Sequence, residues 1–161
     1  MNGLLVKLAI AAAAGSLLYS SPIGAQMPPP QKENQLPPPA KRAAHVEILN
    51  GPALEIAHDG IAIIRWTTNN PGGDDDHYAV AHYGTDPKDL SQTAKNHIRL
   101  NRGHADTIFR VLMQGLKPDT TYYYKVTSMG AGGRSDGEES SVNRFTTPAP
   151  GQVTSAHPPP E

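Results

Sequence analysis

The sequence predicts an all-β fold, a two-sheet antiparallel sandwich of about seven strands. Between residues 44 and 148 the apolar residues recur with a period of two, which is the period of β-strands and not of helices. The apolar runs are short and rich in β-branched and aromatic residues, and clusters of turn-forming residues separate them. Several short strands within roughly 100 residues are typical of such a sandwich.

Five runs carry the strand pattern most clearly. They are IAIIRWTT (61–68), HYAVAHYG (77–84), TIFRVLM (107–113), TYYYKVTS (121–128) and SVNRFTT (141–147). Weaker strands are expected around 45–49 and 53–57, and TAKNHIRL (93–100) is a further candidate. A helical turn is expected only within 86–95, and the glycine-rich segment 130–137 is interpreted as a flexible hairpin connection.

The N-terminal 25 residues have the pattern of a signal peptide. Lys7 precedes an apolar run, 8–18, that is too short to span a bilayer, and small residues predict cleavage after Ala25. A buried N-terminal helix is the weaker alternative, because three consecutive prolines follow Met27. No cysteine is available for a lipid anchor. We therefore expect a secreted or periplasmic protein with no membrane insertion after signal cleavage.

Two proline-rich segments flank the predicted domain. Residues 26–43 are expected to form a disordered linker and residues 149–161 a disordered tail, because both combine many prolines with few large apolar residues. The single folded domain is therefore expected to span residues 44–148, a length that can bury its own core.

Composition excludes several classes of function. The chain has 14 Lys and Arg against 15 Asp and Glu, and removing residues 1–25 takes away only Lys7. Nucleic acids and anionic membranes require a concentrated basic surface, so neither is an expected partner. Cysteine is absent, which excludes disulfides, thiol catalysis and thiolate metal sites.

The chain resembles a known sandwich family at the tyrosine-rich segment. Leu116, Pro118, Thr120 and Tyr122 form a Leu-x-Pro-x-Thr-x-Tyr pattern that resembles the fibronectin type III fold, an immunoglobulin-like sandwich. Trp66 matches the core tryptophan of that fold, and FTTP (145–148) resembles its closing strand.

A narrower resemblance covers residues 45–148. HYGTDPKDLSQTA (82–94) followed by LKPDTTYYYKV (116–126) is similar to the fibronectin-like N-terminal domain of purple acid phosphatases. In those enzymes the bimetal site belongs to a following catalytic domain, and only 13 residues follow Pro148 here. The resemblance therefore implies an accessory domain alone, and we expect no enzymatic activity and no cofactor.

The segment GGDDDHY (72–78) holds the only metal-site candidates that the sequence suggests. Asp74, Asp75, Asp76 and His77 are suitable ligand types, but the segment lacks the ligand spacing of a calcium loop. A solvated turn is the expected structure, with weak calcium binding as the alternative. The seven histidines are dispersed, and no nucleophile elbow is present, so no residue is assigned a catalytic role.

Strand alternation divides the aromatic residues between core and surface. The predicted structural core includes Trp66, Tyr83, Leu116, Tyr122 and Tyr124, with Tyr122 as a tyrosine corner whose hydroxyl returns to the backbone near 116–119.

The residues that alternate with the core residues point away from the core and predict a candidate binding face. It comprises Tyr78, Val80, His82, Tyr123 and Lys125, which should form one exposed patch on neighbouring strands. The alternative is that these residues only reflect the β-propensity of a solvated sheet. Outward-facing apolar residues on the other sheet, Ile61, Ile63 and Leu112, raise the further possibility of a partner or a second copy there.

Three functional hypotheses follow. The first is an exported, non-catalytic interaction or scaffold module that binds an exported or cell-surface protein. The second is an accessory domain that docks on a separately encoded metallophosphatase or other hydrolase. The third is weak metal or glycan binding.

Overall fold

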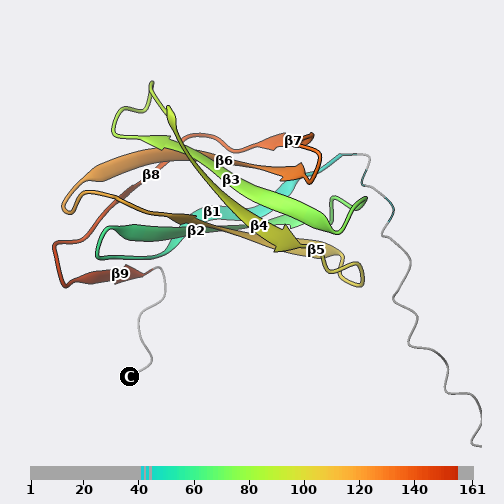
Figure 1. Ribbon diagram of the computed structural model, residues 1–161, viewed down its shortest axis with the longest axis horizontal. Helices are drawn as coiled ribbons and strands as arrows, with labels where there is room; N and C mark the ends of the chain where they lie inside the picture. Colours follow the sequence, from blue (N-terminus) through green and yellow to red (C-terminus); the bar gives the residue numbers. More distant parts are fainter. Residues whose placement is uncertain (1–40, 42, 44, 156–161) are drawn as a thin grey trace, which may run out of the picture. The chain divides into compact units, whose positions relative to one another are not determined.

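The protein, described by a computed structural model at residues 41, 43 and 45–155, forms two antiparallel sheets that face each other (Figure 1). The strands are β1 (Ile48–His58), β2 (Ile61–Asn69), β3 (Asp76–Gly84), β4 (Gln92–Arg99), β5 (Asp106–Met113), β6 (Thr121–Gly130), β7 (Ser135–Glu139), β8 (Asn143–Thr146) and β9 (Val153–Ser155). The predicted signal peptide and most of the predicted linker lie outside the described residues.

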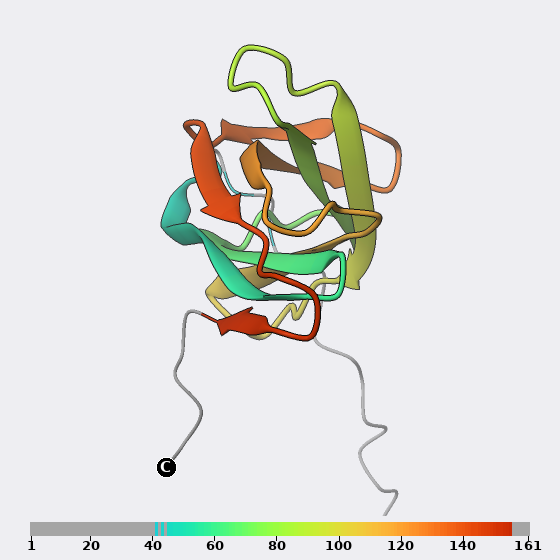
Figure 2. The same cartoon turned by 90° about the vertical axis from the view of Figure 1, so that its left-hand side faces the viewer.

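The four-stranded sheet has the order β5-β2-β1-β9. The five-stranded sheet has the order β4-β3-β6-β7, and β8 also pairs with β6. Seen from the end of the sandwich, the sheets are two distinct layers (Figure 2). The predicted two-sheet antiparallel sandwich is therefore confirmed. The described residues include no helix long and apolar enough to cross a membrane.

One continuous, bulged strand, β1, replaces the two weak strands expected near its position. Its pairing with β2 shifts register three times, by one residue each, and one of these shifts falls between Asn50 and Ala53. Gly51 allows this detour, because its φ is 84° and an added Cβ would lie 2.8 Å from the Arg65 carbonyl oxygen. Glycine and proline within the run therefore mark a bulge here and not the end of a strand.

The C-terminal tail was expected to be disordered from residue 149, and this is wrong for its first part. Val153–Ser155 form β9, which pairs antiparallel with β1 at Ile56–His58. The short Val-Thr-Ser run can pair with the open edge of β1 although prolines surround it in the sequence.

Two expected connections also differ from the observed ones. The glycine-rich segment 130–137 does form a hairpin, but β7 begins within it at Ser135. The helical turn expected within 86–95 is replaced by an isolated bridge between Asp86 and Asp89 and by the start of β4.

The core lies between the two sheets and consists of the inward-facing side chains of the strands. Trp66 and Phe109 are paired across β2 and β5, and their rings stack at 5.4 Å with an interplanar angle of 12°. The other predicted core residues, Tyr83, Leu116, Tyr122 and Tyr124, are buried in the same cluster. Aromatic contacts of this kind stabilise a core beyond the area they bury.

Tyr122 closes the loop before β6. The Lys117 N–H donates a hydrogen bond to the Tyr122 hydroxyl oxygen at 3.0 Å. The ring packs against Phe145 at 5.9 Å and against Tyr83 at 6.2 Å. These contacts fit the tyrosine corner that the sequence predicts.

Tyr122→Phe is expected to lower the free energy of unfolding by about 1 kcal/mol, because it removes one hydrogen bond and keeps the ring packing. Urea denaturation followed by circular dichroism measures the change. Tyr123→Phe is the matched control and should change stability by less than about 0.5 kcal/mol, since Tyr123 has the opposite parity. Equal losses in the two variants would contradict the assignment of the corner.

Candidate binding face on the five-stranded sheet

Four of the five residues of the predicted binding face lie partly exposed on the outer surface of β3 and β6. Tyr78, His82, Tyr123 and Lys125 alternate with core residues along their strands. His82 is paired with Lys125, and Tyr123 lies beside Gly84 at the end of β3. Three of the five predicted residues, His82, Tyr123 and Lys125, are therefore brought together.

Tyr78 lies apart from that group. Its cross-strand neighbour on β6 is Met129, whereas Tyr123 is at the other end of β6. Tyr78 and His82 are four positions apart on β3, a distance of about 13 Å along the strand. The predicted single aromatic patch is thus two separate clusters.

Val80 does not belong to the exposed face, and this part of the prediction is wrong. It has the outward parity, but only 2% of its surface is exposed. It lies between Lys95 of β4 and Thr127 of β6, its two cross-strand neighbours. The Lys95 amine reaches the Tyr78 ring, so its aliphatic stem runs beside Val80 and helps to cover it.

The side chains in the cluster around Tyr78 contact and pair with one another. The Lys95 amine lies 3.9 Å from the Tyr78 ring centroid, a cation–π contact. The His97 ring meets Tyr78 edge-on at 5.4 Å, and its Nε2 donates to an Asp76 carboxylate oxygen at 2.9 Å. Lys95 and His97 were not predicted as part of this face, although the alternation of β4 places both on it.

The cluster around His82 and Lys125 borders a shallow groove of about 460 Å³. The groove is lined by His82, Pro87, Lys88, Asp89, Leu90, Ser91, Lys125 and Val142. One wall is the loop between β3 and β4, which projects beyond the sandwich (Figures 1 and 2). The His82 Nδ1 lies 3.1 Å from the Thr93 hydroxyl, and the Lys125 amine donates to Glu139 at 2.5 Å.

Gly84 holds this loop close to the end of β3. A Cβ at this position would lie 2.1 Å from the Asp89 carbonyl oxygen, a separation that no side chain can adopt. The close backbone approach therefore requires glycine and fixes the wall of the groove.

The rim of the groove carries charges of both signs, from Lys88, Lys125 and Asp89, and is partly apolar. Among the described residues, no carboxylate pairs with the Lys88 amine. Val142 is 48% exposed and adds an apolar side chain to the rim. Sequence reasoning missed Lys88, Leu90 and Val142, because they come from a loop and a strand end that meet only in the folded chain.

The predicted metal candidates point in different directions. Asp75 accepts hydrogen bonds from Arg102 and, at 3.3 Å, from Arg99, whereas Asp76 accepts one from His97. The hydrogen bond from Arg102 is the main cause that lowers the pKa of Asp75, with Arg99 acting in the same direction.

His77 faces the interior and is only 1% exposed. Its Nδ1 lies 3.0 Å from an Asp136 carboxylate oxygen, to which the Ser128 hydroxyl also donates at 2.7 Å. The described part of the chain brings no three histidine or acidic side chains together in a metal-binding geometry. To hold an ion, Asp75 would have to release Arg99 and Arg102, and Asp76 would have to release His97.

Comparison with known proteins decides the family. Residues 54–147, more than half of the chain, match the purple acid phosphatase N-terminal domain. The chain belongs to this family. The match begins within β1 and continues just beyond β8, so it includes the groove and the five-stranded sheet but not β9 of the other sheet. Only the N-terminal domain of purple acid phosphatases is matched, and this match does not indicate catalytic activity.

Other comparisons add little. The sensor domain of the anti-sigma factor RsgI4 from Pseudobacteroides cellulosolvens is 21% identical, with a TM-score of 0.45. That similarity covers 70% of this chain and 98% of the sensor domain. No curated protein matches the chain.

Proposed function

We propose that the chain is an exported, non-catalytic interaction module of the purple acid phosphatase N-terminal domain family. It binds a partner protein through the groove end of the five-stranded sheet. The observation that supports this most strongly is the groove itself, where His82, Lys88 and Lys125 line the same hollow as Asp89 and the exposed Val142. Export rests on the leader pattern of residues 1–25.

The chemistry of the groove favours a partner segment that is both acidic and apolar. Leu90 and Val142 offer apolar contact, and Lys88 offers a cation that no described carboxylate neutralises. The Lys125–Glu139 ion pair is exposed, so it stabilises the domain by no more than about 1 kcal/mol. Lys125 can therefore exchange Glu139 for a carboxylate of the partner at little cost.

Site-specific photo-crosslinking in the source cells tests this function. A benzophenone amino acid in place of Val142 is expected to give a discrete crosslinked species. Lys88→Glu combined with Lys125→Glu should reduce its yield about tenfold, because both contacts become repulsive.

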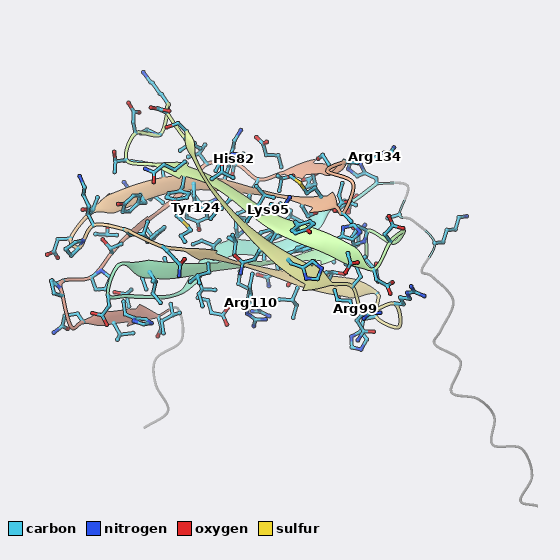
Figure 3. The ribbon with its side chains drawn as sticks, viewed as in Figure 1. His82, Lys95, Arg99, Arg110, Tyr124 and Arg134 are labelled. Atoms are coloured by element: carbon cyan, nitrogen blue, oxygen red, sulfur yellow. The ribbon has the colours of Figure 1, made fainter. Side chains whose placement is uncertain are left out.

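The matched control uses Arg134, at the far end of the same sheet (Figure 3). A crosslinker at position 134 should give no such species, and Arg134→Glu should leave the yield from position 142 unchanged. Equal yields from positions 142 and 134, or no effect of the two lysine substitutions, would refute binding at the groove.

A second candidate is docking on a separately encoded metallophosphatase or other hydrolase. Family membership favours it, because the domain is matched to one that precedes a catalytic domain in purple acid phosphatases. Mass spectrometry of the species crosslinked from position 142 distinguishes the two functions. Hydrolase peptides would support docking on an enzyme, and peptides from a protein with no hydrolase domain would support a general interaction module.

A further inference from the structure

The outer face of the four-stranded sheet is apolar where a solvated sheet face is normally polar. Its outward apolar side chains are Ile56, Ile61, Ile63, Ile108, Leu112 and Val153. Two of them, Ile108 and Val153, are 45% and 63% exposed. β2 opens with Ile-Ala-Ile-Ile, apolar on both parities, which is the pattern of a sheet that is covered on both faces.

Three of these side chains form a continuous row across the sheet. Ile63 is paired with Ile56 on one side and with Leu112 on the other. The row, which we call the apolar band, therefore crosses β1, β2 and β5 at right angles to the strands, near the start of β2. Ile61 lies next to it toward the turn, and Arg65 and Arg110 separate it from Ile108.

The charges on the two sides of the band are opposite. On one side Arg110 forms a two-pronged ion pair with Glu55, at 2.7 and 3.2 Å, and Arg65 has no carboxylate partner among the described residues. On the other side the Asp59 carboxylate, in the turn between β1 and β2, is 67% exposed; it lies 3.4 Å from the His58 Nδ1 and accepts a hydrogen bond from the Gly151 N–H at 3.3 Å. The face thus carries an unneutralised cation in the middle of β2 and a solvent-exposed anion in the turn before β2.

We propose that a second copy of the chain covers this face. The two four-stranded sheets pack against each other about a two-fold axis that lies in the interface, perpendicular to β2 and close to Ile63. The apolar bands then meet, and the Arg65 end of one copy faces the Asp59 end of the other. Because a two-fold interface repeats each contact, the Arg65–Asp59 pair forms twice.

The dimensions of the strands support this pairing. Arg65 lies about 7 Å from Ile63 along β2, and Asp59 lies about 13 Å from Ile63 in the opposite direction. The remaining offset along the strands is about 6 Å and the packed sheets are about 10 Å apart, so the Arg65 and Asp59 side chains must both extend toward each other to meet. Within one copy the same two residues are about 20 Å apart along the strand, so they cannot pair with each other.

The area of the face predicts a weak dimer. Four strands about 4.8 Å apart and some eight residues long cover roughly 500 Å². Two such faces give about 1,000 Å², the lower end of the range for specific interfaces. We therefore expect dissociation in the micromolar range. Dimerisation would point the two five-stranded sheets outward in opposite directions, because His82 and Arg110 lie on opposite sides of the sandwich (Figure 3).

Sedimentation velocity of the purified protein from about 1 to 200 μM tests the dimer. The wild type should shift from monomer to dimer over this range, and Ile63→Lys should remain monomeric. Val142→Lys is the matched control, since it places the same charge on an exposed apolar position of the other sheet, and it should dimerise normally. A wild type that stays monomeric, or an association that Ile63→Lys leaves unchanged, would overturn the proposal.

A charge exchange tests whether the partner is a second copy in this orientation. Arg65→Glu and Asp59→Lys should each weaken association about tenfold, and the double variant should restore it. Asp59 has a φ of 43°, so Asp59→Asn, which tolerates that backbone, is the second variant and should also weaken association. Failure of the double variant to restore association would overturn the orientation. Neither result depends on the groove, so the dimer and the proposed function fail separately.

Discussion

Trp66→Ala is expected to lower the free energy of unfolding by about 3–5 kcal/mol. Trp66 is fully buried at the centre of β2, stacks on Phe109, and lies against the backbone of Gly51 in the bulge of β1. Its removal would leave a cavity that both sheets border. A domain of this size has a total stability of about 5–15 kcal/mol, and the chain has no disulfide to compensate.

Urea denaturation measures this loss by far-UV circular dichroism, because Trp66 is the only tryptophan and its fluorescence disappears in the variant. Trp66→Phe is the control and should lose clearly less stability, since it keeps an aromatic ring against Phe109. A loss below about 1 kcal/mol for Trp66→Ala would show that the core does not depend on this ring.

Alkaline pH is expected to destabilise the fold through Tyr124. Burial raises the pKa of Tyr124 from 10.0 to about 12, and its hydroxyl donates to the Pro52 carbonyl oxygen at 3.4 Å. The unfolded chain releases this proton from about pH 10, whereas the folded chain holds it to about pH 12. The stabilisation is therefore complete below pH 10 and is lost as the pH rises to 12, by about 2–3 kcal/mol.

Urea midpoints of the wild type and Tyr124→Phe between pH 9 and 12 isolate this contribution, because lysines that titrate in the same range are common to both proteins. Stability should fall more steeply with pH in the wild type. Burial also raises the pKa of Tyr83, so some decline remains in the variant. Identical slopes in the two proteins would contradict the burial of an un-ionised Tyr124.

Strand parity was the property that the sequence predicted well. Alternation separates Tyr122 and Tyr124, which are buried, from Tyr123, which lies partly exposed on the outer face. Parity states only which side of a sheet a residue occupies. Val80 has the outward parity and is nevertheless buried, because the long Lys95 side chain beside it reaches over to Tyr78.

Register and loop geometry could not be predicted from the sequence. The distance between Tyr78 and Tyr123 depends on how β3 and β6 align, and periodicity carries no information about that alignment. The groove depends on the close backbone contact between Gly84 and Asp89, for which the sequence shows only a glycine. The strand β9 was missed because the surrounding prolines dominated the composition of the tail.

Hydrolysis of p-nitrophenyl phosphate by the purified protein, with and without added iron, zinc or manganese, tests most directly whether this domain is non-catalytic. We predict no turnover above that of the buffer with any of these ions. Metal-dependent turnover that keeps its specific activity through repurification, and that falls when Asp75 and Asp76 are both replaced by asparagine, would contradict it.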